Sequence, residues 1–120
     1  MIIDKNKIER INFFCRWDIH NNRTFLLLYE KKVIASYQIE YSNQNEYHPV
    51  LHSIYVEPEY RKQNLFNLIM IEALNELSNI PVINLKVRTD NFIKDKYKKY
   101  GFVDNYIDGI FQWMCKQIEK

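Results

Sequence analysis

The sequence predicts an α/β fold in which a mixed, mostly antiparallel sheet surrounds a central strand–helix–strand crossover. Short apolar runs rich in β-branched and aromatic residues, which are typical of strands, occur toward both ends of the chain. Between them, a strand-like run at 50–56 precedes a helical pattern at 61–77 and another strand-like run at 82–87. Hairpins on either side of such a crossover give a mixed sheet.

Composition sets the class of protein. The chain has 120 residues, which fits one domain over 1–120, and 47% hydrophobic residues predict a packed core. A formal net charge of +2 is too small to indicate a nucleic-acid or membrane partner. No apolar stretch suits a signal peptide or a membrane span, so we expect a cytoplasmic protein. Cysteines and histidines lack metal-ligand spacing, so no metal is expected.

The first part of the chain is predicted to form three strands. Residues 8–19 mix apolar, aromatic and charged side chains and favour a strand, although residues 5–10 could equally begin a helix. An Asn-Asn pair then marks a turn. Apolar runs at 24–29 and 33–41, separated by a polar turn, predict a hairpin.

The crossover follows. The strand at 50–56 must end at Pro58, because proline cannot continue a central ladder. Residues 61–77 place apolar side chains at three-to-four spacing, which predicts a helix with one buried face. Pro81 blocks its continuation, and 82–87 is the next strand.

The last part is predicted to hold a short basic helix and a hairpin. The helix covers 91–100 and ends at Gly101, a left-handed C-cap. Strands at 102–107 and 110–118 flank a two-residue turn at 108–109 with type I′ character.

The segment that joins the strand at 50–56 to the following helix carries the chemical signal. The first turn of a helix has N–H groups without partners and a positive dipole end. It is therefore an anion site, suited to a pyrophosphate. Arg61 and Lys62 add positive charge there.

Three motifs link this segment to a known family. The loop reads Val-Glu-Pro-Glu-Tyr-Arg-Lys-Gln-Asn-Leu-Phe over 56–66. Downstream, Leu-x-Val-x-x-x-Asn covers 85–91, and Tyr-Lys-Lys-Tyr-Gly-Phe covers 97–102. In this order and spacing they resemble the coenzyme loop, the Asn-bearing helix and the closing motif of the GCN5-related N-acetyltransferase (GNAT) family. The resemblance extends over about 24–118.

The resemblance implies a GNAT-like fold and an N-acetyltransferase that uses acetyl-coenzyme A. The acceptor would be a primary amine of a protein, a peptide or a small molecule, which attacks the acetyl group directly. The pantetheine arm would lie along the strand before Val56, and a backbone N–H there would polarise the acetyl carbonyl. The residues expected at the coenzyme are Ile54, Tyr55, Val56, Arg61, Lys62, Gln63, Asn64, Leu65, Phe66, Asn67, Asn91 and Tyr97.

The resemblance also suggests a catalytic acid. Tyr97 falls where the family's helix carries a tyrosine that protonates the leaving thiolate, although it could instead only pack on the sheet. The lysines in this helix are Lys94, Lys96, Lys98 and Lys99. Such a run is usually a solvated face, and contact with the 3′-phosphate of the coenzyme is the alternative.

For the base, His52 is the first candidate. Strand alternation would put it on the same face as Val50, Ile54 and Val56, and an ordinary histidine pKa near 6.5 suits the task. A half-buried histidine satisfied by a neighbour is the plain alternative. Glu57 and a water chain are the rival bases.

Two departures from the family pattern support a second hypothesis. Asn64 stands where the family has its first loop glycine, and Phe66 stands at the second. Asparagine tolerates positive φ better than most residues, but its side chain takes space beside the phosphate. The alternative is therefore a catalytically inactive GNAT-fold protein that binds coenzyme or a protein partner.

Few residues separate the first two predicted strands, where the family usually has helices that cover the acceptor. The acceptor groove should then be open, or completed by a second subunit in a homodimer.

Overall fold

The computed structural model describes residues 2–14, 21–41, 48–91 and 94–117. They form one seven-stranded sheet in the order β1-β2-β3-β4-β5-β7-β6. Its strands are β1 Glu9–Phe14, β2 Asn22–Tyr29, β3 Lys32–Glu40, β4 Val50–Val56, β5 Val82–Arg88, β6 Val103–Asp108 and β7 Phe111–Gln117. β4 and β5 are parallel, and the other neighbouring pairs are antiparallel. The predicted fold class is confirmed.

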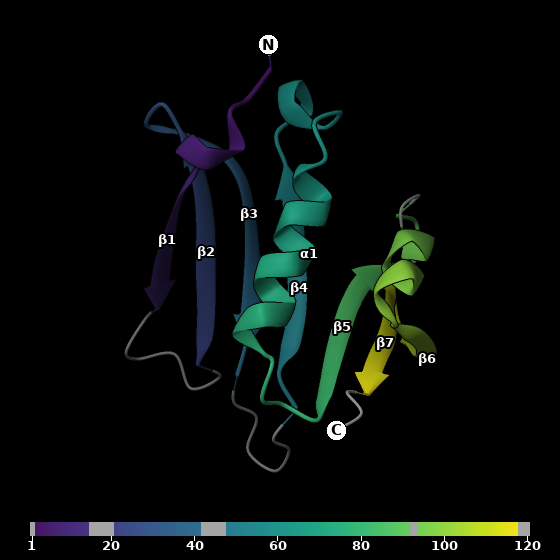
Figure 1. Cartoon of the computed structure of the whole chain (residues 1–120). Coiled ribbons are helices and arrows are strands. Elements are labelled where there is room, and N and C mark those ends of the chain that lie inside the picture. Colours follow the sequence, from purple (N-terminus) through teal and green to yellow (C-terminus); the bar gives the residue numbers. More distant parts are fainter. Residues whose placement is uncertain (1, 15–20, 42–47, 92–93, 118–120) are drawn as a thin grey trace.

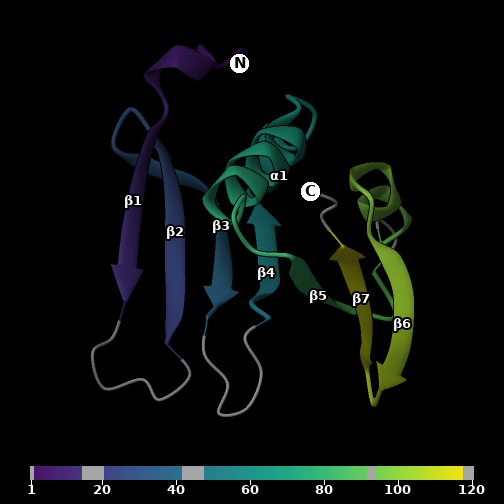
Figure 2. The same cartoon turned by 60° about the horizontal axis from the view of Figure 1, so that its bottom comes forward.

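One α-helix, α1 Leu65–Glu76, joins β4 to β5 and packs over β3 and β4 (Figures 1 and 2). Its buried face carries Leu65, Ile69, Met70 and Ala73. Shorter 3₁₀ turns are η1 Lys5–Lys7, η2 Pro58–Tyr60 and η3 Lys94–Tyr100. Within the described ranges, no helix has the length and apolar character needed to cross a membrane.

The sheet buries one face against α1. On β3, Tyr37 and Ile39 are fully buried, whereas Gln38 and Glu40 on the opposite face are half-buried. The ring of Tyr37 stacks on that of Phe25 of β2, with 4.8 Å between centroids. This alternation confirms the period of two read from the sequence.

One helix differs from expectation in where it begins and another in its type. α1 begins at Leu65, not at residue 61, because Asn64 adopts a left-handed conformation with φ 62° and ψ 26°. A residue in that conformation cannot belong to a right-handed helix, so the preceding residues form turns. Near the C-terminal hairpin, the described part of the basic helix is the 3₁₀ helix η3, and Gly101 follows it with φ 93°.

The hairpin of β6 and β7 turns one residue later than expected. Asp108 pairs with Phe111, so Gly109 and Ile110 form the turn. Only Gly109 has positive φ, at 61°, and a type I′ turn needs it at both positions. The type I′ prediction is therefore wrong. The end of the predicted first strand, residues 15–19, lies outside the described residues.

A β-bulge in β4 has the largest effect on the site. Ser36 of β3 pairs with Tyr55, and Gln38 pairs with His52. One β3 residue therefore faces two β4 residues, Ser53 and Ile54, and Ser53 has φ 55°.

The bulge reverses the alternation of β4. Val56 pairs with Ala35, which is buried, while His52 pairs with Gln38 on the half-buried face. Ile54 and Val56 pack against the core. The prediction that His52 shares a face with Ile54 and Val56 is therefore wrong, because an extra residue shifts a period of two by one.

The parallel strands of the crossover separate after a short contact. β4 pairs with β5 only through Val50 with Asn84 and Leu51 with Leu85. Figure 1 shows the two strands diverging from there toward the end at which α1 begins.

Candidate active site between the separated strands

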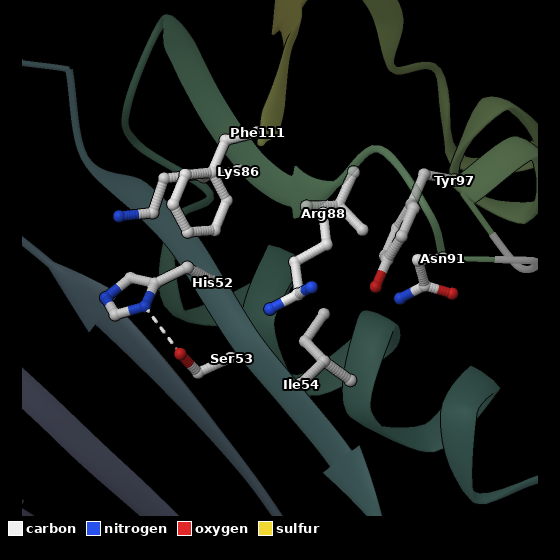
Figure 3. A pocket seen from close by; sticks show the side chains of 9 residues that line it. His52, Ser53, Ile54, Lys86, Arg88, Asn91, Tyr97 and Phe111 are labelled. Carbon is white, nitrogen blue, oxygen red and sulfur yellow. Dashed lines mark hydrogen bonds between the residues drawn. The ribbon is translucent and has the colours of Figure 1, made fainter. Parts of the chain in front are cut away.

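A cavity of about 380 Å³ lies between β4 and β5 where they separate (Figure 3). Both strands, η3 and the start of β7 contribute to its wall. The lining residues are His52, Ser53, Ile54, Lys86, Val87, Arg88, Asn91, Tyr97 and Phe111. Four residues named from the sequence, His52, Ile54, Asn91 and Tyr97, are thus brought together.

Tyr97 presents its hydroxyl to this cavity (Figure 3). The side chain is only 3% exposed, and its ring packs edge-on against Phe66 with 5.2 Å between centroids. Burial raises the pKa of Tyr97 to about 12. At neutral pH the hydroxyl is protonated, as it would be at the ordinary tyrosine pKa of 10, and it can act as a proton donor.

His52 is held at both ring nitrogens. Its Nδ1 lies 2.9 Å from the Ser53 hydroxyl, and its Nε2 lies 3.1 Å from Oδ1 of Asn22. Burial and, to a smaller extent, the nearby Lys86 ammonium together lower the pKa of His52 to about 4. The expectation of an ordinary histidine pKa is therefore wrong. The imidazole is neutral at physiological pH.

Lys86 brings positive charge to the open face of the cavity. Its Nζ lies 4.8 Å from the ring centroid of Phe111 and 5.7 Å from that of Trp113. Such cation–π contacts hold the ammonium in place. Arg88, two residues along β5, is instead paired with Asp90 at 3.0 Å.

A second hollow, of about 290 Å³, lies where α1 begins. Basic side chains from the loop before α1 and from η3 meet there. The lining residues are Arg61, Lys62, Asn64, Phe66, Asn67, Lys96, Lys99 and Tyr100. We call it the basic groove.

The lysines of η3 divide into two sets. Lys96 and Lys99 line the basic groove, whereas Lys98 contacts Asp95 at 3.3 Å and Asp104 at 3.5 Å. The side chain of Lys94 lies outside the part of the chain that the structure describes. Lys96, Lys98 and Lys99 are all exposed, as expected of a solvated face, and two of them also line the basic groove.

The two residues that depart from the family pattern each fit the local structure in a different way. Asn64 takes the left-handed conformation for which glycine is favoured. The ring of Phe66 packs against Tyr97 and against Tyr100, the latter at 6.0 Å between centroids. The Tyr100 hydroxyl donates a hydrogen bond of 2.7 Å to Asn67. Phe66 thus joins α1 to η3.

Several expected coenzyme residues have side chains engaged elsewhere. Gln63 accepts a hydrogen bond from the backbone N–H of Ile3 at 2.7 Å, and Leu65 is fully buried. Arg61 donates through Nε to the carbonyl of Val56 at 2.8 Å, and its guanidinium lies over the Tyr55 ring. Gln63 and Leu65 are not among the residues that line the basic groove.

The rival base Glu57 does not line the cavity. It follows the last residue of β4, and its backbone N–H donates to the carbonyl of Ile34 at 2.8 Å.

The sequence interpretation missed Ser53, Asn22 and Lys86. Ser53 enters the site through the bulge, which leaves no clear mark in a single sequence. Asn22 was assigned to a turn, but it is the first residue of β2. Lys86 follows from the alternation of β5, in which Ile83, Leu85 and Val87 are buried, so that signal was available.

Comparison with known proteins identifies the family. The family model described as acetyltransferase (GNAT) domain matches residues 9–115 of the sequence. PH1933 from Pyrococcus horikoshii OT3 is similar in structure, with TM-score 0.73 at 18% identity over 81% of this chain and 66% of that protein. The PaiA N-acetyltransferase from Thermoplasma acidophilum, solved with coenzyme A, gives TM-score 0.67 at 20% identity over 79% of this chain and 60% of that protein.

A third structure matches along its whole length. A GNAT family acetyltransferase from Elizabethkingia anophelis, solved with acetyl-CoA, gives TM-score 0.73 at 11% identity over 94% of this chain and 99% of that one. At these identities the likeness concerns the fold alone.

The chain spans less than two thirds of the first two proteins' length. No curated protein sequence matches it. Because the family model covers most of the sequence, the chain belongs to the GNAT acetyltransferase domain family.

Proposed function

We propose that this chain transfers the acetyl group of acetyl-coenzyme A to a primary amine. The observation that carries the proposal is the cavity between the separated strands, into which the Tyr97 hydroxyl is directed. Membership of the GNAT family and similar structures solved with coenzyme A or acetyl-CoA support the same reading. The proposal covers amines of proteins, peptides and small molecules.

The basic groove fits the phosphates of the coenzyme. Within the described ranges, Lys62, Lys96 and Lys99 have no carboxylate within ion-pair distance, so their charge is available to an anion. The first N–H groups of α1 add donors at the same place. Backbone groups at 62–67 and these lysines would hold the phosphates.

The edge of β4 fits the pantetheine arm. After Leu51 this edge has no pairing with β5, so backbone groups at 54–56 can pair with an extended ligand as with an added strand. Asn91 lines the same cavity from the start of the next loop. When bound, acetyl-CoA supplies an activated thioester.

The chain's own residues then handle protons and charge. A backbone N–H near Val56 would donate to the carbonyl oxygen of the thioester. Tyr97, whose hydroxyl is protonated at neutral pH, would protonate the leaving thiolate. His52 and Lys86 lie on the face of the sheet opposite α1, from which the acceptor would approach.

Binding is the first test. Thermal unfolding with acetyl-CoA at about 100 times its dissociation constant should stabilise the protein by about 2.7 kcal/mol. Lys99→Gln should weaken this binding, and Lys98→Gln is the matched control because Lys98 contacts Asp95 and Asp104. Equal effects of the two changes would contradict the assignment of the groove.

Transfer is the second test. Release of free coenzyme A would be followed with two probe amines, glycinamide and a lysine amide blocked at its α-amine. Tyr97→Phe should lower kcat with unchanged acetyl-CoA affinity, while Tyr106→Phe, an exposed tyrosine of β6, should not. Binding of acetyl-CoA without transfer to any amine would favour a coenzyme-binding module over an enzyme.

A further inference from the structure

A chain of hydrogen bonds crosses three strands beside the cavity. Nδ2 of Asn22 on β2 donates to Oε1 of Gln38 on β3 at 3.1 Å. The Asn22 oxygen therefore faces His52, whose Nε2 lies 3.1 Å away. Because an amide oxygen only accepts, Nε2 must carry the hydrogen in this contact.

This arrangement fixes the state of the other ring nitrogen. A neutral imidazole that carries its hydrogen on Nε2 has an unprotonated Nδ1. The Ser53 hydroxyl, at 2.9 Å, therefore donates to Nδ1. A hydroxyl joined to a histidine, which a third group orients, is the arrangement that activates a hydroxyl for proton transfer.

His52 and Ser53 both line the cavity, but Ser53 is the one that can still accept a hydrogen bond from an acceptor amine. Both nitrogens of His52 are occupied, so the imidazole itself has no free atom for an acceptor amine. Ser53 is exposed, lines the cavity and keeps two acceptor lone pairs on Oγ. It sits at the bulge with φ 55°, a strained conformation of the kind that gathers at functional sites.

We propose that Ser53, His52 and Asn22 form a proton relay that deprotonates the acceptor amine. The inference rests on the proposed acetyl transfer. As the amine nitrogen bonds to the acetyl carbon, its proton passes to Ser53 Oγ while the Ser53 proton passes to His52 Nδ1. The carbon–sulfur bond breaks, and the sulfur takes the Tyr97 proton. The proton on His52 then returns to Ser53 Oγ, which releases one proton to solvent, and solvent restores the proton of Tyr97.

In this relay Ser53 is a catalytic residue that touches the amine. His52 acts through Ser53, and Asn22 is a positioning residue that fixes the tautomer. Glu57, the other base considered, does not line the cavity.

The test compares variants in acetyl transfer to glycinamide. Ser53→Gly and His52→Ala should each lower kcat by about 100-fold, with acetyl-CoA affinity unchanged. Glycine is chosen for residue 53 because it tolerates the positive φ there. The double variant should lose no more than either single one, because members of one relay act as a unit. Ser36→Ala is the matched control, since Ser36 faces Tyr55 rather than His52.

Asn22→Asp gives a readout that a purely structural role would not move. A carboxylate at Nε2 raises the pKa of His52, against the charge of Lys86 on β5. In Asn22→Asp, the pKa of His52 measured by NMR should then rise, and the pH below which kcat declines should rise with it. If that pH stays in place while the NMR pKa moves, the relay is overturned.

The outcomes separate the two proposals. An active wild type with an equally active Ser53→Gly variant overturns the relay and leaves acetyl transfer standing. The relay is also overturned if the fold-loss of kcat in the double variant equals the product of the two single losses. A wild type that binds acetyl-CoA but acetylates neither probe amine contradicts the proposed function, and the relay falls with it.

Discussion

Asn64 provides the sharpest test of the loop that precedes α1. Its backbone has φ 62° and ψ 26°, which for non-glycine residues costs roughly 1–2 kcal/mol. Alanine at this position would bear that cost, whereas glycine avoids it but adds about 0.4–1 kcal/mol of chain entropy to the unfolded state. We therefore expect Asn64→Gly to be more stable than Asn64→Ala by about 1 kcal/mol.

Thermal unfolding without ligand measures this difference. About 1 kcal/mol corresponds to a shift in Tm of roughly 3–6 °C in a domain of this size. Asn21, with φ 49°, is the control, because its glycine and alanine variants should differ in the same direction outside the basic groove. If Asn64→Ala and Asn64→Gly unfold at the same temperature, Asn64 is not left-handed in solution, and the reason given for the start of α1 is wrong.

The same variants report on the coenzyme. If asparagine stands in for a loop glycine, Asn64→Gly should bind acetyl-CoA at least as tightly as the wild type, while the Asn21 variants bind as the wild type does. Tenfold weaker binding by Asn64→Gly, about 1.4 kcal/mol, would mean that the side chain itself holds the ligand.

Three further predictions follow. Since burial lowers the pKa of His52 from 6.5 to about 4, the unfolded state binds more protons than the folded state between these pH values. The free energy of unfolding, measured by urea titration, should therefore fall as pH drops from 6.5 to 4. His52→Gln should make this decrease smaller. Since burial raises the pKa of Tyr97 from 10 to about 12, stability should fall as pH rises through that window, and Tyr97→Phe should lessen the loss; an unchanged slope would contradict the burial. Phe66→Gly, although it restores the family residue, should destabilise the protein by about 2–3 kcal/mol, because the ring packs on η3; unchanged stability would refute this packing.

The sequence predicted the order and type of the elements because they depend on local signals. β4 was predicted with the bounds that the structure has, since an apolar run and a proline define it. The start of α1 was missed because Arg61 to Asn64 have no residue that forbids a helix. Only the backbone conformation of Asn64 ends the turn and begins the helix.

The sequence predicted some of the residues that line the cavity, but not the geometry of the candidate site. Tyr97 and Asn91, from the family motifs, line one cavity with His52, from the strand before the coenzyme loop, because these elements meet. The partners of His52 come from β2 and from the bulge, which are long-range features of pairing and register. A single sequence carries no signal for which β3 residue will face two residues of β4.

The bulge also explains how one strand could serve two substrates. Without it, His52, Ile54 and Val56 would share a face, and the base and the coenzyme arm would compete for the same side of β4. With it, Ile54 and Val56 turn to the core side, where α1 begins and the basic groove lies. His52 stays on the opposite face with Lys86. On the proposed function, coenzyme and acceptor would then approach from opposite faces of the sheet and meet where β4 and β5 separate, with Ser53 at the meeting point because it is the bulged residue.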